Sequence, residues 1–395
     1  MNFRSYEIKD ICKIKSGKRL PKGTDFSEKP TKHKYIRARD IKNGKIDGSD
    51  LGYISEETQK KIERYIVNTN DIIITIAGTI GEVALVSKKF DGVNLTENAV
   101  RLTEFSKDVC PEFLAYILKS PERKEYMEQV AGGSAQPKLG IYKIEAIKVD
   151  LPDVQIQHKI ADILSAYDNL IENNQKQIKL LEEAAQRLYK EWFVNLRFPG
   201  HENTKIVDGV PEGWNEKILS QVANVIMGQS PKSEFYNSEK KGLPFHQGVG
   251  SYGVRFVMDD IYSTSYTRIA EPNSILFSVR APVGRLNITK SKVVIGRGLA
   301  AINQTDGCQS YLYYLLKNRF FKDNIVGNGS IFASVSKDEL LNQKFLIPER
   351  NLMMQFEKIV SQMDKQIENL DSKNKKLIEA RDRLLPKLMS GEVEV

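Results

Sequence analysis

The feature that most constrains this chain is an internal duplication whose two copies lie 196 residues apart, as the pair Pro152 and Pro348 shows. At this offset, residues 168–173 and 364–369 share an aspartate, an isoleucine, a glutamate and an asparagine. The ungapped register continues through Lys179 and Lys375, Leu181 and Leu377, Glu183 and Glu379, Ala184 and Ala380, Arg187 and Arg383, and Leu188 and Leu384. A repeat of this length predicts a fold made of two similar units.

The segments that precede these matches are duplicated more loosely, with small gaps. Residues 70–75 align with 273–278, residues 113–116 with 311–314, and Gly133-Ser134 with Gly329-Ser330. The polar residues of the two copies differ within this shared apolar pattern. Such divergence is expected of two units that read different targets, although neutral drift would produce a similar pattern.

Two long helices are predicted in the best-matched part of the repeat. Residues 152–193 contain no internal Pro or Gly after Pro152, and apolar residues recur there at spacings of three and four. The second copy continues the same pattern from Leu352 to Leu388. A narrow stripe sustained this long is typical of a coiled coil, and about 40 residues span roughly 60 Å. Packing against the chain's own globular parts is the alternative.

Each apolar stripe has one polar interruption, Asn174 in the first helix and Asn374 in the second. If a pseudo-twofold axis perpendicular to the helices relates the two copies, the helices pair antiparallel. A register with Asn174 opposite Asn374 then places Ile178 opposite Leu370, although a shift of one heptad fits the stripe equally well. Buried asparagines are known to fix the register of coiled coils.

These patterns predict globular units at residues 1–150 and 199–347, alternating with helical segments at 151–198 and 348–395. Within the globular units, short apolar runs bounded by Gly, Asn and Asp alternate with helical patterns. We therefore expect an α/β or α+β fold in each globular unit.

The net charge of +8 and the pI of about 9.0 suit a polyanionic partner such as DNA, although simple solubility would also explain them. In the first unit, apolar and polar or aromatic residues alternate along 34–39. A strand there would place Tyr35, Arg37 and Arg39 on one face. Such side chains could reach phosphates or base edges, but isolated surface arginines are usually just solvated. The corresponding stretch of the second unit offers His246 and Gln247.

Loops that occupy matching places in the two copies supply the other candidate DNA contacts. Arg280 stands where the first unit has Ala77, which reflects either a different target base or an ordinary surface change. The remaining candidates are Lys18, Arg19, Lys22, Gln136 and Lys138 in the first unit, and Gln229, Ser230, Lys232, Arg297 and Ser330 in the second.

Several kinds of chemistry are not indicated. The three cysteines and four histidines show no metal-ligand spacing, so neither a metal site nor a disulfide is expected. The chain has no Asn/Asp-Pro-Pro-aromatic loop of an adenine methyltransferase and no GxxxxGK[ST] loop, and Gly296 and Gly298 form only an isolated GxG. We expect no catalytic residue and no cofactor on this chain. The charged first residues and the broken apolar run 72–80 suggest a soluble, cytoplasmic protein without a membrane span.

The chain as a whole resembles the specificity subunits of type I restriction–modification systems. The resemblance rests on the duplicated Asp-x-x-Ile-Glu-Asn helices, on the Leu/Ile-Pro entries at Pro152 and Pro348, and on the matching Gly-Ser turns. It implies that the globular units are target recognition domains, each reading half of a bipartite double-stranded DNA site. The helices are then expected to form a spacer that fixes the gap and docks two modification subunits.

The resemblance also implies that catalysis comes from partners. Modification subunits would supply S-adenosylmethionine and adenine methylation, and restriction subunits would supply ATP- and Mg²⁺-dependent translocation and cleavage. A coiled-coil scaffold that binds protein without DNA sequence preference is the alternative function, and a fused methyltransferase–specificity enzyme is the enzymatic one.

Overall fold

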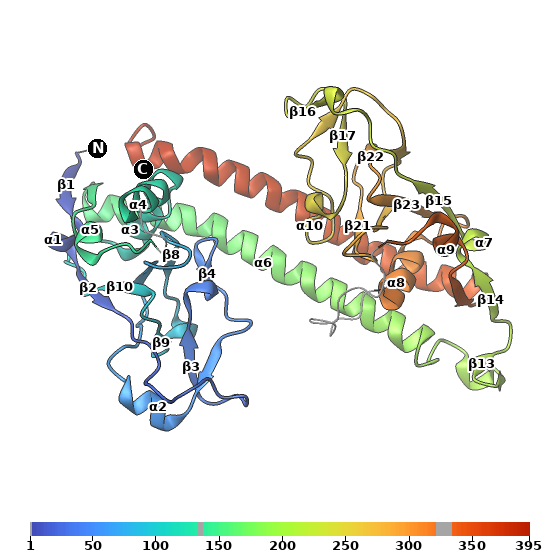
Figure 1. The fold of residues 1–395 in the computed structure, drawn as a ribbon, viewed down its shortest axis with the longest axis horizontal. Helices are drawn as coiled ribbons and strands as arrows, with labels where there is room; N and C mark the ends of the chain where they lie inside the picture. The colour runs from blue at the N-terminus through green and yellow to red at the C-terminus, as the bar shows by residue number, and fades with distance from the viewer. Residues whose placement is uncertain (1, 133–136, 321–333) are drawn as a thin grey trace. The chain divides into compact units, whose positions relative to one another are not determined.

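The computed structural model describes residues 2–132, 137–320 and 334–395, and it divides into two compact units (Figure 1). Unit 1 comprises Met1–Glu172 and Asn374–Val395, and unit 2 comprises Asn173–Lys373. Each unit thus combines one of the predicted globular segments with part of each long helix. The predicted division into four consecutive segments, at 150, 198 and 347, stays a prediction.

Unit 1 is built around the sheet order β2-β10-β7-β8, with smaller sheets of order β6-β3-β9, β1-β11 and β4-β5. Strand Ile72–Thr75 is buried throughout and rich in isoleucine, as is typical of a central strand. Helix α3 packs beside β8 (Figure 1). The elements are β1 (Arg4–Glu7), α1 (Ile8–Ile11), β2 (Lys13–Ser16), β3 (His33–Ile36), β4 (Ile41–Lys42), β5 (Lys45–Ile46), β6 (Gly52–Ile54), α2 (Glu56–Lys61), β7 (Ile72–Thr75), β8 (Val83–Leu85), β9 (Asn94–Leu95), β10 (Ala99–Thr103), α3 (Pro111–Leu118), α4 (Pro121–Ala131), α5 (Ile141–Glu145) and β11 (Lys148–Leu151).

Unit 2 repeats this plan with the sheet orders β15-β23-β20-β21 and β14-β24, and its β17 again lies between an antiparallel and a parallel neighbour. The elements are β12 (Ile206–Val207), β13 (Val210–Pro211), β14 (Asn215–Ile218), α7 (Leu219–Val222), β15 (Ala223–Met227), β16 (Tyr236–Asn237), β17 (Leu243–His246), β18 (Tyr262–Ser263), β19 (Ile269–Ala270), β20 (Ile275–Ser278), β21 (Leu286–Ile288), β22 (Val293–Ile295), β23 (Leu299–Gln304), α8 (Gln309–Phe320), α9 (Lys337–Leu341) and β24 (Lys344–Ile347). The loosely matched segments that the structure describes, 70–75 with 273–278 and 113–116 with 311–314, therefore fold alike.

The two predicted long helices are confirmed as α6 (Val154–Phe193) and α10 (Arg350–Ser390). Helix α6 begins just after Pro152, whose ring disfavours helical backbone in the residue before it. Helix α10 continues through Pro386, which lies close to its C-terminal end. Within the described residues, no helix is both long and apolar enough to cross a membrane.

In unit 1 the first half of α6 and the last part of α10 run antiparallel. Asn374 Nδ2 donates to the Ile171 carbonyl at 3.4 Å, and Arg381 Nη1 lies 2.5 Å from Asp168 Oδ1. Higher numbers on α10 thus meet lower numbers on α6. Leu388, further along α10, belongs to the same buried core cluster as Leu164.

In unit 2 the second half of α6 and the first part of α10 also run antiparallel. Tyr189 and Trp192 both pack on Phe356, with ring centroids 6.0 and 5.9 Å apart. Towards the other end, Arg255 lies within 3.2 Å of Glu182 on α6 and within 2.5 Å of Asp364 on α10. Trp192 is a core residue of this unit.

The prediction of a continuous strand over residues 34–39 is wrong. Strand β3 ends at Ile36, and Ala38–Asp40 form a 3₁₀ helix. The side chain of Asp40 accepts hydrogen bonds from the backbone N–H and from the guanidinium of Arg37, and this local cap turns the chain out of the sheet. Arg37 and Arg39 are therefore not strand neighbours of Tyr35.

Candidate nucleic-acid interface

In unit 1, three chain segments meet on a backbone framework at the ends of β2, β3 and β9. Strand β3 runs parallel to β9. The Thr96 N–H donates to the Ile36 carbonyl at 3.0 Å, and the Lys18 N–H donates to the Leu95 carbonyl at 2.8 Å. Residues 17–19, 36–37 and 95–98 are thereby fixed side by side.

Unit 2 builds the same framework from the equivalent segments. Strand β17 runs parallel to β22. The Gly296 N–H donates to the His246 carbonyl at 2.8 Å, and the Gln229 N–H donates to the Ile295 carbonyl at 2.9 Å. The equivalence is residue by residue, so that position 97 of unit 1 corresponds to Arg297.

A glycine is required at the start of this framework in both units. A Cβ atom on Gly17 would lie 2.0 Å from the Thr96 carbonyl oxygen, and one on Gly228 would lie 2.1 Å from the Gly296 carbonyl oxygen. Either contact is far inside van der Waals distance. The glycines of the isolated GxG have a similar role, because a Cβ on Gly298 would meet the Gln247 carbonyl oxygen at 2.6 Å.

In unit 1 the framework carries an ion pair between two of its segments. Arg19 Nε donates to Glu97 Oε1 at 2.7 Å. Partial burial raises the pKa of Glu97, but hydrogen bonds, chiefly from Arg19, outweigh it, so that the net shift is downward. Glu97 is therefore an ionised acceptor at neutral pH.

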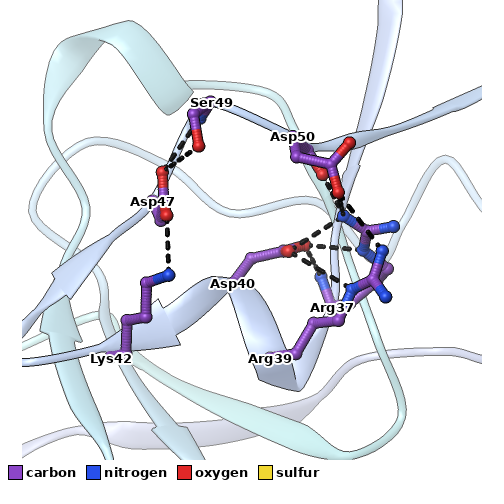
Figure 2. A network of polar contacts seen from close by, with 7 residues as sticks. All are labelled: Arg37, Arg39, Asp40, Lys42, Asp47, Ser49 and Asp50. Atoms are coloured by element: carbon purple, nitrogen blue, oxygen red, sulfur yellow. Dashed lines mark hydrogen bonds and ion pairs between the residues drawn. The ribbon is translucent and has the colours of Figure 1, made fainter. Parts of the chain in front are cut away.

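The two arginines that follow β3 are held by carboxylates (Figure 2). Arg37 donates to both carboxylate oxygens of the buried Asp40 at 2.9 Å, and also to the backbone carbonyl of Asp50. Arg39 lies nearer the surface, with its Nη2 3.3 Å from Asp50 Oδ2. Arg37 thus stabilises the turn, whereas the more exposed Arg39 pairs with Asp50 at the surface and, more loosely, with the buried Asp40, whose Oδ1 lies 3.9 Å from Arg39 Nε.

The same turn continues into a second small network (Figure 2). Lys42 Nζ lies 2.8 Å from Asp47 Oδ2, while Asp47 Oδ1 accepts from the hydroxyl of Ser49 at 2.6 Å. These hydrogen bonds hold the pKa of Asp47 well below its ordinary value, and the bond from Lys42 has the largest effect. The network orders the hairpin beside the arginines.

In unit 2 the framework carries polar side chains without an acid. Ser230 Oγ donates to Gln247 Oε1 at 2.8 Å and accepts from the Arg297 N–H at 3.2 Å. The amide nitrogen of Gln247 is left as a donor. The guanidinium of Arg297 forms no ion pair or hydrogen bond with any residue that the structure describes.

A further pair of matching bridges adjoins the framework. Ala77 pairs with Lys138 in unit 1, and Arg280 pairs with Ser334 in unit 2. Each bridge thus carries one basic residue. It is Lys138, on the second segment, in unit 1, and Arg280, on the first segment, in unit 2. In unit 2 the Val279 N–H donates to the Gly298 carbonyl at 2.9 Å, which links Arg280 to the framework.

Two of the predicted DNA-contacting residues, Tyr35 and His246, are buried rather than exposed at the surface. Tyr35 is 3% exposed, and its hydroxyl donates to the Lys18 carbonyl at 2.6 Å. His246 is fully buried; its Nδ1 lies 2.9 Å from Ser251 Oγ, and its Nε2 lies 3.2 Å from Asp259 Oδ1 without the alignment of a hydrogen bond. Both side chains are packing residues, because strands β3 and β17 point them into the core.

The remaining candidates are lysines and polar loop residues. Lys18, Lys22, Lys138, Gln229 and Lys232 are all exposed. Gln136 and Ser330 lie outside the described residues. Asn174 and Asn374 are buried, and their proposed pairing stays a prediction because the two residues belong to different units.

Sequence reasoning missed the acids that surround the basic candidates. Glu97, Asp40 and Asp50 decide which cations are free, yet none of the three belongs to a recognisable motif. The repeat contained a signal for Glu97, because its alignment with Arg297 exchanges a negative charge for a positive one. Among the described residues, no cluster of His, Cys, Asp or Glu is arranged to hold a metal ion.

A family profile for the type I restriction modification DNA specificity domain matches residues 2–183 and again 211–380. The two matches correspond to the two copies of the repeat. Together they cover most of the chain.

Individual relatives agree with this match. The chain is 30% identical to a putative type I restriction enzyme MjaX specificity subunit of Methanocaldococcus jannaschii, over 98% of this chain and 93% of the relative. It is 23% identical to the type I restriction enzyme HindI specificity subunit of Haemophilus influenzae, over 99% of this chain and the whole relative. The crystal structure of an S subunit from M. genitalium superposes with a TM-score of 0.64 at 19% identity, over 98% and 96% of the two chains, and so shares the fold.

Proposed function

The chain belongs to the family of type I restriction–modification DNA specificity subunits, and from this premise we propose that its two recognition units each read one half of a bipartite DNA site. One observation carries the proposal. The same backbone framework occurs twice in the chain, with different polar side chains on each copy. A duplicated scaffold with exchanged donors and acceptors is what two readers of different sequences require.

The charge distribution of the interface supports DNA as the ligand. Arg280, Arg297 and Lys232 in unit 2, and Lys22 and Lys138 in unit 1, are exposed cations on or beside the framework loops. Cations of this kind bind phosphates and release counterions, which gives affinity without sequence choice. Sequence choice then comes from side chains that reach base edges.

The long helices would serve as the spacer and as the docking surface for partners. Helices α6 and α10 each contribute residues to both units, so they connect the two recognition surfaces covalently. Two modification subunits would bring S-adenosylmethionine and methylate adenine, and restriction subunits would bring ATP and Mg²⁺. On this proposal the chain selects the site and assembles the complex, and the chemistry takes place on its partners.

The proposal is tested by co-expressing the full chain with its cognate adenine modification subunit and mapping N6-methyladenine in the host DNA at single-molecule resolution. We expect a bipartite motif with a fixed gap. Exchanging residues 1–150 for the same segment of a relative should change one half of that motif and leave the other half intact.

The coiled-coil scaffold makes a different prediction in the same experiment. It allows a stable complex with the modification subunit but no methylated motif. Failure to form any complex with the modification subunit would contradict the proposed function.

A further inference from the structure

The framework carries one position at which the two units present opposite charge. Glu97 follows Thr96 in unit 1, and Arg297 follows Gly296 in unit 2, after backbone hydrogen bonds that match in both units. Both side chains therefore start from the same point of the same scaffold. Glu97 is 27% exposed as a side chain, and Arg297 is exposed.

This charge reversal argues against a phosphate contact at the position. A carboxylate beside a phosphate is repelled, so a position that holds a glutamate in one of the two copies is not a shared contact to the DNA backbone. A site that reads base edges has no such restriction. Arginine donates two hydrogen bonds to guanine O6 and N7, and glutamate accepts from the N4 amino group of cytosine.

The neighbours of each side chain suit these roles. Arg19 donates to Glu97 Oε1, which holds the carboxylate in one orientation and leaves Oε2 to accept from the Thr96 hydroxyl and from a ligand. In unit 2, Ser230 takes the place of Arg19, and its hydroxyl accepts from the Arg297 N–H at 3.2 Å. Gly296 and Gly298 keep the backbone on either side of Arg297 in close contact with residue 247.

We propose that residues 97 and 297 are equivalent specificity-determining positions, with Arg297 reading a guanine in the unit 2 half-site and Glu97 reading a cytosine in the unit 1 half-site. This inference rests on the proposed function. It goes beyond that function by assigning one base in each half-site to one residue.

The test is the methylation motif of single variants of the full chain, co-expressed with the cognate modification subunit. Arg297→Ala should relax one guanine of the unit 2 half-site to other bases, with roughly a 10- to 100-fold loss of discrimination, and leave the unit 1 half-site unchanged. Glu97→Ala should relax one cytosine of the other half-site only. Lys232→Ala, which removes an exposed cation near the same framework, should lower methylation without changing the motif.

Arg297→Lys separates base reading from phosphate binding, because lysine keeps the charge but loses the bidentate geometry. If Arg297 reads a base, Arg297→Lys should still lower the preference for guanine at that position of the motif. This variant therefore tests the inference even if Arg297→Ala yields no active complex. An Arg297→Lys variant that keeps the wild-type motif would overturn the inference. So would relaxation spread over both half-sites. A wild-type chain that gives no motif would instead refute the proposed function itself.

Discussion

At the scale of single residues, the framework depends on two glycines that have no room for a side chain. Gly228 carries no left-handed backbone requirement; its constraint is the 2.1 Å approach of the Gly296 carbonyl oxygen to the position of a Cβ. That oxygen belongs to backbone held in the sheet, so it cannot rotate away as the end of a long side chain would. Gly17 has the same role in unit 1.

We therefore predict that Gly228→Ala destabilises unit 2 by about 1–3 kcal/mol, the usual cost of overpacking. Both tryptophans of the chain, Trp192 and Trp214, lie in the core of this unit, so denaturant unfolding followed by tryptophan fluorescence measures the loss. Gly248→Ala is the matched control, because a Cβ on Gly248 meets no atom within 4 Å. Equal stability of the two variants would show that the backbone adjusts freely.

Lys119 gives unit 1 a specific pH dependence. Burial lowers the pKa of this lysine from 10.5 to about 8, against the attraction of Asp168 and helped by Lys45 and Arg381. Between pH 8 and 10.5 the folded state has released a proton that the unfolded state still holds, so stability increases with pH in that window. Below pH 8 the buried charge is a constant cost.

Lys119→Met should consequently be more stable than the wild type near pH 7, and its advantage should shrink as the pH rises from 8 to 10.5. The change is bounded by about 1.4 kcal/mol per pH unit for one proton, and partial exposure of the side chain reduces it. Urea unfolding followed by circular dichroism at several pH values measures the difference between the two proteins. Lys61→Met, at an exposed lysine, is the control variant, and a trend of equal size in it would refute the assignment.

Of the interface, the sequence could predict the segments but not the state of each side chain. The aligned loops at 17–22 and 228–232 and the counterpart of Arg297 all fall on the framework. Pairing with Asp40 and Asp50 was not predictable, because these acids act through a 3₁₀ turn that replaces the expected strand. The burial of Tyr35 and His246 likewise depends on which face of a short strand meets the core, and alternation alone does not decide this.

At the scale of elements, one buried arginine joins the globular part of unit 2 to both long helices. Arg255 is 2% exposed, it stacks over the Tyr313 ring at 4.5 Å, and it pairs with Glu182 on α6 and Asp364 on α10. Unit 1 treats the equivalent aspartate, Asp168, differently. There the arginine that pairs with Asp168 is Arg381 of helix α10, and the globular part contributes the Tyr116 hydroxyl, which donates to Asp168 at 2.6 Å.

Arg255→Met should destabilise unit 2 by about 3 kcal/mol, because it leaves two poorly solvated carboxylates without their counter-charge. Lys290→Met removes a more exposed pair with Asp371 and should cost about 1 kcal/mol or less. Tryptophan fluorescence during denaturant unfolding again measures both. Adding Glu182→Gln and Asp364→Asn to Arg255→Met should recover most of the loss; no recovery would mean that packing on the tyrosines, rather than charge, is what Arg255 supplies.

The helices were the most predictable elements. Apolar residues that recur three and four positions apart in a segment without glycine indicate a helix without any information from distant residues. Their partners were not predictable. Arg255 lies in a loop of unit 2 that has no signature in the sequence, and only the folded chain brings it to residues 73 and 109 positions away. The proposed pairing of Asn174 with Asn374 likewise depends on contacts between the helices that the pattern of apolar residues does not specify.

At the scale of the whole molecule, the boundary between the two compact units falls within both long helices, at Glu172/Asn173 and at Lys373/Asn374. If the helices act as the proposed spacer, the length of chain across these two boundaries sets the gap between the half-sites. The half-sites themselves should depend only on the frameworks. Gap and sequence choice are then separable by mutation.

Inserting one heptad into each helix at these boundaries tests that separation. Seven helical residues add about 10 Å and keep the apolar stripe in phase, and about 10 Å corresponds to roughly three base pairs of DNA. We expect the mapped motif to keep both half-sites while its gap lengthens by about three base pairs. Methylation should also weaken, because three base pairs rotate the second half-site by about 100° on a duplex of about 10.5 base pairs per turn.

An insertion of the same length in the exposed turn at Asp208-Gly209, between β12 and β13, should leave the gap unchanged. An unchanged gap after the helix insertions would mean that the helices do not set the spacing, and a changed half-site would mean that recognition depends on the helices as well as on the frameworks.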